Sequence, residues 1–83
     1  MGAASLRNIL GLLVLLLWLL IVARVIVSWV DPRGANPFSR TVIAWSEPIL
    51  APVRRMIPPA GGLDFSPLLV AVVLGVLLRV LGV

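Results

Sequence analysis

The sequence contains no cysteine and no histidine. Without cysteine there is no disulfide framework, no thiolate nucleophile and no zinc cluster. Without histidine, the commonest general base and the commonest nitrogen ligand for metals and haem are both missing. We therefore expect a protein that is not an enzyme and that holds no cofactor.

Charged residues are scarce as well. They make up 12% of the chain, with three acidic and seven basic side chains, whereas 61% of the residues are hydrophobic. The mean hydropathy is +1.20. A chain of 83 residues with this composition has too little polar surface to cover a water-soluble core. The composition indicates a membrane protein, whose main partner is the lipid bilayer.

The basic residues are all arginines and are spread along the chain. A pI near 11.9 is typical of proteins that bind nucleic acid. Arginines that flank apolar segments, however, more often orient a protein against anionic lipid headgroups. We therefore expect anionic headgroups, rather than nucleic acid, as the charged partner.

Two long apolar stretches account for the hydropathy. The first runs from Ile9 to Val30 with Arg24 as its one charge, and the second runs from Leu68 to Val83 with Arg79 as its one charge. A helix needs about 20 such residues to cross a bilayer. Each stretch is therefore interpreted as a transmembrane helix.

The first stretch also has features of a secretory signal peptide, since it follows Arg7. It is longer than the roughly 7 to 15 apolar residues of such a peptide. A cleavage site after Ala23 would need a small residue where Ile21 stands. We expect the first helix to be retained.

Local signals place the helix ends. Ser5 can cap the first helix, which should end before Asp31-Pro32 because proline disfavours helical geometry in the residue that precedes it. Asp64 or Ser66 can cap the second, with Pro67 at its first position. The sequence predicts one all-α membrane domain, a two-helix hairpin with transmembrane helices at about residues 6–30 and 66–83 and an interfacial connector at residues 31–63.

The connector carries six of the seven prolines, too many for one continuous helix. Asn36 followed by Pro37 is a good helix start, and Pro48 should end or kink the helix that follows. A second short turn, Pro52 to Met56, carries two adjacent arginines. The apolar residues of the first segment fall on one helical face: Phe38, Val42, Trp45 and Ile49.

This apolar face has two interpretations. A stripe with Trp45 and nearby arginines such as Arg54 and Arg55 is how a helix lies in the headgroup plane. The stripe could equally pack on the two transmembrane helices. The sequence does not favour either arrangement.

Arg24 lies inside the first span, about 9 Å from its end. Ser28 follows four residues later on the same helical face, and Asp64 at the top of the second span is the nearest plausible carboxylate in a hairpin. The three could form a structural clamp. Arg24 could instead snorkel to the interface or serve a substrate or ion site.

Small residues and arginine placement give two weaker signals. Ala71 and Gly75 form a small-x-x-x-small pattern, whose partner is either the first helix or another protomer in a homo-oligomer.

The connector holds four arginines, more than the two ends together. The positive-inside rule then places the connector in the cytoplasm of a multi-pass protein of the inner (cytoplasmic) membrane.

Four segments, taken in order, resemble the YggT (YlmG-like) family of small membrane proteins: Arg24–Pro32, Asn36–Pro37, Glu47–Pro58 and Gly61–Pro67. The arginine-serine-tryptophan combination in the first segment and the glycine-leucine-aspartate-x-serine-proline run in the last are specific. The resemblance implies an integral membrane protein with a two-helix hairpin unit, found in bacteria and plastids. It implies no catalytic residue.

The same resemblance implies links to cell-division gene clusters, to osmotic tolerance and, in plastid relatives, to haem attachment or nucleoid distribution. The leading hypothesis is a scaffold or assembly factor with a protein partner that the sequence does not identify. The alternative is a protomer of a small channel or transporter. The candidate structural or partner-binding residues are Arg24, Ser28, Trp29, Asn36, Trp45, Glu47, Arg54, Arg55, Asp64 and Ser66.

Overall fold

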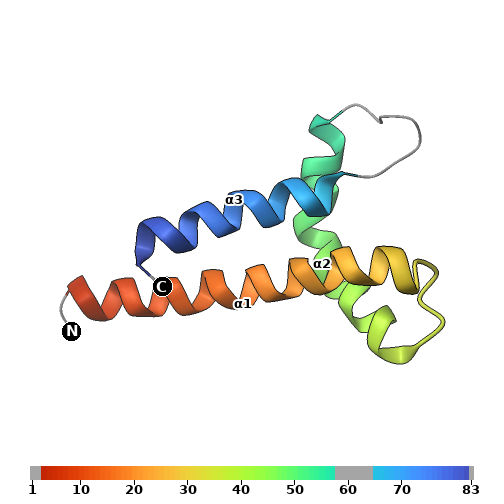
Figure 1. Ribbon diagram of the computed structural model, residues 1–83, viewed down its shortest axis with the longest axis horizontal. Coiled ribbons are helices and arrows are strands. Elements are labelled where there is room, and N and C mark those ends of the chain that lie inside the picture. Colours follow the sequence, from red (N-terminus) through yellow and green to blue (C-terminus); the bar gives the residue numbers. More distant parts are fainter. Residues whose placement is uncertain (1–2, 58–64, 83) are drawn as a thin grey trace.

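The computed structural model describes residues 3–57 and 65–82, with side chains from residue 5 onward. This part of the chain is all-helical, as predicted (Figure 1). It contains three helices: α1 (Ala3–Val30), α2 (Pro37–Met56) and α3 (Ser66–Leu81).

Helix α1 ends at Val30, where the Asp31-Pro32 pair predicts its end. Its start differs from the prediction, because Ala3 is already helical and Ser5 therefore lies inside the helix instead of capping it. Alanine is the best helix former, so the residues before Ser5 extend the helix readily. By length and composition, residues Ser5–Val30 could cross a membrane.

Helix α3 is the shorter of the two apolar helices. Its 16 residues span about 24 Å, which is less than a bilayer's hydrocarbon thickness of about 30 Å. Its N-cap residue is Phe65, whose side chain makes no capping bond, and Ser66 is helical and 2% exposed. Ser66 is therefore not the predicted cap, and Asp64 lies outside the described residues.

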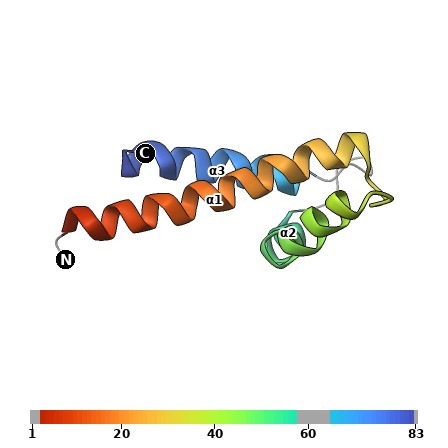
Figure 2. The same ribbon diagram turned by 90° about the horizontal axis from the view of Figure 1, so that it is seen from below.

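Helices α1 and α3 lie side by side and antiparallel (Figures 1 and 2). Ile21 of α1 and Val70 of α3 meet in the core together with Leu50 of α2. Closer to the amino terminus, a Cβ built on Gly75 would lie 3.5 Å from Nε1 of Trp18. The small residue at position 75 thus faces α1, the first of the two partners that the sequence allowed.

Helix α2 crosses the α1–α3 pair near the connector end and lies against one face of the pair (Figures 1 and 2). Asn36 caps it as predicted, because its side-chain oxygen accepts a hydrogen bond of 2.8 Å from the backbone N–H of Phe38. Pro37 occupies the first turn, where no backbone donor is needed. The buried residues of α2 are Ser39, Val42, Ser46 and Leu50.

The helix does not stop at Pro48, and the predicted separate turn from Pro52 to Met56 is part of the same 20-residue helix. Each proline removes one backbone hydrogen bond and crowds the carbonyl four residues earlier. Both prolines are exposed, so the face of α2 that packs on α1 and α3 is not disturbed. Burial of Leu50, which is fully enclosed, favours continuation of the helix.

The apolar stripe of α2 packs on the other two helices only in part. Val42 is buried and Ile49 packs against the core, whereas Phe38 and Trp45 are 68% and 69% exposed. The side chains of the stripe span an arc of the helix, and only one edge of that arc reaches α1 and α3. Part of the stripe is therefore free for another environment.

A charged cluster between α1 and α2

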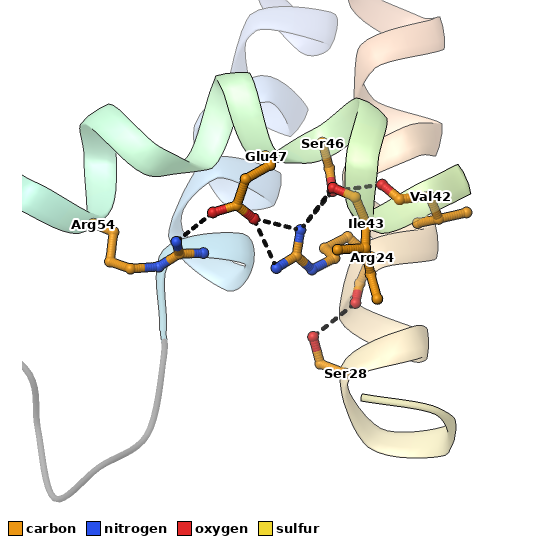
Figure 3. Close-up of polar contacts among 7 residues, drawn as sticks. All are labelled: Arg24, Ser28, Val42, Ile43, Ser46, Glu47 and Arg54. Carbon is orange, nitrogen blue, oxygen red and sulfur yellow. Dashed lines mark hydrogen bonds and ion pairs between the residues drawn. The ribbon is translucent and has the colours of Figure 1, made fainter. Parts of the chain in front are cut away.

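Arg24 projects from α1 toward α2 and contacts three residues of that helix (Figure 3). Its Nη1 donates to Oγ of Ser46 at 2.7 Å, to Oε2 of Glu47 at 3.1 Å and to the carbonyl of Ile43 at 3.3 Å. Its Nη2 lies 3.1 Å from the same Glu47 oxygen. The side chain is only 12% exposed, so these contacts replace most of its hydration.

Ser46 is fully buried and connects the guanidinium to the backbone of α2. Its Oγ lies 2.6 Å from the carbonyl of Val42 and 3.2 Å from that of Ile43, and it accepts the bond from Arg24. No buried side-chain nitrogen or oxygen among the described residues lacks a hydrogen-bond partner. The serine therefore lets α1 and α2 approach closely without an unsatisfied polar group.

Glu47 also binds a second arginine. Its Oε1 accepts a hydrogen bond of 2.5 Å from Nη1 of Arg54. The two residues are seven positions apart, about 10 Å along the helix axis, and Pro48 and Pro52 lie between them. Seven residues are about two helical turns, so Glu47 and Arg54 lie on nearly the same side of α2. The ion pair thus braces the part of α2 that has lost backbone hydrogen bonds.

The two guanidinium groups hold the pKa of Glu47 below its ordinary value. The hydrogen bond from Arg54 is the largest cause, partial burial acts in the opposite direction, and the bond from Arg24 adds to the lowering. The carboxylate is therefore charged at neutral pH. Arg24, Ser46, Glu47 and Arg54, called the Arg24 cluster below, carry a net charge of one positive unit.

The cluster marks one side of α2. Glu47, Arg54 and the Arg24 guanidinium lie on the side of α2 that also faces Ser28, toward the carboxyl end of α1 (Figure 3). Since successive residues are about 100° apart, Trp45 lies almost opposite Glu47 around the helix. Helix α2 therefore has three faces, which are a packing face, a polar face with the cluster and an exposed apolar face.

The exposed apolar face extends along the whole helix. Phe38, Trp45 and Met56 are 68%, 69% and 77% exposed. These three residues define the apolar face of α2. Phe38 and Met56 are 18 residues apart, which is about 27 Å along the helix. Large apolar side chains in a row of this length indicate an environment other than water.

The structure brings together some of the predicted site residues and separates others. Arg24, Glu47 and Arg54 meet in one cluster (Figure 3). Ser28 lies outside it, and its Oγ donates a hydrogen bond of 2.8 Å to the backbone carbonyl of Arg24, one turn earlier in α1. Asp64, the predicted carboxylate partner of Arg24, lies outside the described residues. Sequence reasoning did not pair Arg24 with Glu47 and did not single out Ser46.

The remaining predicted residues lie apart from the cluster. Trp29 is 83% exposed at the end of α1, Trp45 is on the apolar face, and Arg55 is exposed on α2. Asn36 acts as a helix cap, and Ser66 is buried at the start of α3. Within residues 3–57 and 65–82, no group of three or more His, Cys, Asp or Glu residues could hold a metal ion.

Comparison with known proteins identifies the family. Residues 3–83 match the model of the CCB3/YggT family. The chain is 40% identical over 76 residues to the uncharacterized protein YggT of Escherichia coli (strain K12), an alignment that covers 92% of this chain. It is 46% identical over 54 residues to an uncharacterized protein of Vibrio alginolyticus, covering 65% of this chain and 28% of that protein.

The curated relatives are longer than this chain, which spans 38% of the length of the Escherichia coli protein. A protein of Pseudomonas aeruginosa, also uncharacterized, is 44% identical over 48 residues, which are 58% of this chain and 24% of that protein. No solved structure matches the chain. The family resemblance seen in the sequence is thereby confirmed.

Proposed function

Since the chain belongs to the CCB3/YggT family, we propose that it is a non-enzymatic membrane scaffold or assembly factor. In this proposal, α1 and α3 form a hairpin in the bilayer, and α2 lies at its surface to recruit a protein partner or anionic lipid. The observation that carries the proposal is the three-faced α2 helix, fixed to α1 by the Arg24 cluster.

The surface of the α1–α3 pair supports its placement in lipid. Its exposed side chains are almost all apolar, and exposed apolar surface of this extent indicates a lipid environment. Because α3 is short, the bilayer would thin locally around the hairpin. The large exposed apolar residues of the two helices are Leu6, Ile9, Leu10, Leu12, Leu13, Leu16, Leu17, Leu19, Ile26, Trp29, Val30, Leu68, Leu69, Val72, Val73, Val76, Leu77 and Val80.

The faces of α2 support its placement at the interface. An interfacial helix inserts its apolar side chains a few ångströms into the acyl boundary and turns its charged side to water. Phe38, Trp45 and Met56 provide the first kind of side chain, and Glu47 and Arg54 the second. In this placement the last turns of α1 extend past α2 and bring Trp29 to the headgroup level, where tryptophan is common.

The polar face of α2 is the proposed recruiting surface. Arg40 and Arg55 are exposed, and Arg54 is held in place by Glu47. Arginines in fixed positions suit carboxylate and phosphate groups, which they bind with two parallel hydrogen bonds. The arginine bias of the connector supports a cytoplasmic side for this surface and an inner-membrane location for the protein.

The alternative function is a protomer of an oligomeric channel or transporter, in which the arginines of the two apolar helices, Arg24 and Arg79, would line the pore. Arg79 is exposed near the end of α3 and is available to a lumen. Arg24 is instead engaged by Ser46 and Glu47 within the protomer. The exposed apolar surface of α3 is compatible with contact between protomers, so this alternative predicts an oligomer of defined size.

Site-specific photocrosslinking in cells tests the scaffold proposal. A photoreactive residue at Arg55 should capture one discrete protein or anionic lipid, because this position is exposed beside the polar face. The same residue at Trp45, on the apolar face, is the matched control and should capture bulk lipid. Self-crosslinks alone at both positions would contradict the scaffold and favour the oligomeric channel.

A second variant tests whether crosslinking at position 55 depends on the Arg24 cluster. In a Glu47→Leu background, α2 loses its ion pair with Arg24 of α1, and Arg54, next to position 55, loses its contact with Glu47, so the polar face is held less firmly on the hairpin. We expect the product from position 55 to weaken and that from position 45 to persist. A product from position 55 that is unchanged in this background would show that recruitment does not depend on the Arg24 cluster.

A further inference from the structure

The described helices do not fill the two ends of the molecule equally. At the connector end α2 lies against α1 and α3, so three helices share the cross-section there (Figures 1 and 2). Farther along, only α1 and α3 continue, and α1 extends beyond the end of α3 (Figure 1). The three described helices therefore form a wedge that is wide at the level of α2 and narrow at the other end.

The added width consists of one helix lying across the pair. Helix α2 is 20 residues long, about 30 Å, and in Figure 1 it runs across α1 and α3. With its apolar face turned into the acyl boundary, it displaces lipid from the connector-side leaflet alone. A shallow insertion of this kind is easier where the headgroups are spread apart, as they are in a convex leaflet.

From this shape we propose that the protein senses membrane curvature, and that its ligand is the lipid surface of a leaflet that is convex on the α2 side. The inference rests on the proposed membrane placement and deepens it by naming the surface that α2 recognises. Phe38, Trp45 and Met56 fill the gaps between spread headgroups. Arg40 and Arg55 are exposed on the same helix and suit the phosphates around those gaps.

The Arg24 cluster makes the wedge a fixed shape. A free amphipathic helix can tilt or leave the membrane when lipid packing changes, and its insertion then does not constrain the rest of the protein. Here Arg24 holds α2 at Ser46 and Glu47, and Leu50 is fully buried among the three helices. The hairpin anchors the chain, and the curvature of the surrounding leaflet then decides where in the membrane it accumulates.

The test uses protein reconstituted into phospholipid vesicles of mixed diameter and observed one vesicle at a time. The chain has no lysine, so an amine-reactive dye labels its amino terminus alone. In the proposed topology that terminus is on the side opposite α2. A membrane-impermeant quencher therefore leaves fluorescent the molecules whose α2 faces the convex outer leaflet.

We expect the density of the protected molecules per membrane area to be at least about twofold higher on the smallest vesicles than on the largest. The quenched molecules, whose α2 faces the concave leaflet, should not be enriched there. Equal densities at all diameters would overturn the inference. Equal enrichment of both populations would also overturn it, because the preference would then not come from α2.

Variants assign the effect to the apolar face. Phe38→Ala, Trp45→Ala and Met56→Ala together should remove the enrichment of the protected molecules. The matched control truncates three exposed side chains of α3, Leu68→Ala, Leu69→Ala and Val76→Ala, and should keep it. Enrichment that survives the triple change in α2 would contradict the proposal.

A depth measurement separates this inference from the proposed function. With Trp18→Phe and Trp29→Phe, Trp45 is the one tryptophan left, and lipids brominated near the headgroup should quench it more than lipids brominated near the chain ends. If the lipids brominated near the headgroup quench Trp45 more but the protein shows no curvature preference, the curvature inference is wrong and the proposed placement of α2 at the interface stands. No quenching by either lipid would overturn both.

Discussion

Helices α1 and α2 both expose large apolar side chains, but they are held in place by different contacts. The exposed residues of α1 surround most of the helix, and its charged contact is Arg24. Helix α2 has a side-chain cap at its start, and its buried face and its polar cluster lie on different sides of the helix. Tolerance to substitution should therefore be high along the exposed part of α1 and low along α2.

The largest effect is expected for Leu50→Ala, because Leu50 is fully buried where the three helices meet. Deleting a leucine side chain from a closed core costs about 2 to 5 kcal/mol. Reversible unfolding in mixed micelles with increasing dodecyl sulfate measures the change. The control Leu12→Ala, on the exposed surface of α1, should stay within about 0.5 kcal/mol. Equal losses at both positions would erase the contrast between the helices.

The next effect concerns the ion pair between α1 and α2. Glu47→Leu leaves Arg24 without its carboxylate at a position where its side chain is 12% exposed. Breaking a buried pair costs about 3 to 5 kcal/mol, but the Glu47 side chain is 40% exposed, so we expect about 1 to 3 kcal/mol. The same unfolding measurement applies.

A double variant sharpens this prediction. Arg24→Met with Glu47→Leu removes both charges, and Ser46 keeps its bonds to the backbone of α2. The double change should be less harmful than the sum of the two single changes, because position 24 no longer carries a buried charge without its carboxylate. Strict additivity would show that the two residues do not stabilise each other.

A smaller effect is expected at the start of α2. Asn36→Ala removes the side-chain oxygen that accepts from the N–H of Phe38, and loss of such a cap costs about 1 kcal/mol. Amide hydrogen exchange of the first turn of α2 should rise, while exchange in α1 should not change. Asn36→Asp keeps an acceptor and is the control. Faster exchange in both variants would mean that the cap oxygen is not what protects the turn.

The smallest effect is the pH dependence of α2. The pKa of Glu47 is lower in the folded protein than its ordinary value, chiefly because Arg54 donates to it. The stability that this pairing contributes is present above the ordinary glutamate pKa and is lost as the pH falls through the folded pKa. Unfolding in acid should therefore be less pH-dependent in Glu47→Gln.

A second carboxylate, Asp31, also has a lowered pKa in the folded protein and needs its own control. The backbone N–H groups of Asn36 and Ala35 donate to Asp31 at 2.9 and 3.0 Å and lower its pKa. Asp31→Asn removes that contribution, so the variant that carries both changes should show the flattest acid response. If Glu47→Gln and the native chain lose stability in parallel, Glu47 contributes nothing to the acid response.

Local signals in the sequence were sufficient for the ends of two helices. Asp31-Pro32 ends α1, and Asn36-Pro37 starts α2 with the cap that the residue types predict. Such signals act within a few residues and do not depend on the rest of the fold. The prediction of an all-helical chain depends on composition in the same way.

The errors arose where tertiary packing outweighs a local preference. Of the two outcomes predicted at Pro48, an end or a kink, the end is wrong: the helix continues to Met56, and Ser46 and Leu50 on either side of the proline are buried. Arg24 and Glu47 lie on different helices and are separated in the sequence by a loop and half of α2. No local residue spacing therefore predicts their pairing. The sequence contains three carboxylate side chains that could pair with Arg24, and the structure shows the pairing with Glu47.

The central claim is that α2 lies at the membrane interface with Phe38, Trp45 and Met56 in lipid and its polar face in water. The native chain has no cysteine, so single cysteines along α2 can each carry a spin label. Collision with oxygen, which concentrates in lipid, should peak at positions 38, 45 and 56. Collision with a water-soluble nickel complex should peak at positions 40, 47 and 55. Water exposure on all sides of α2 would contradict the account.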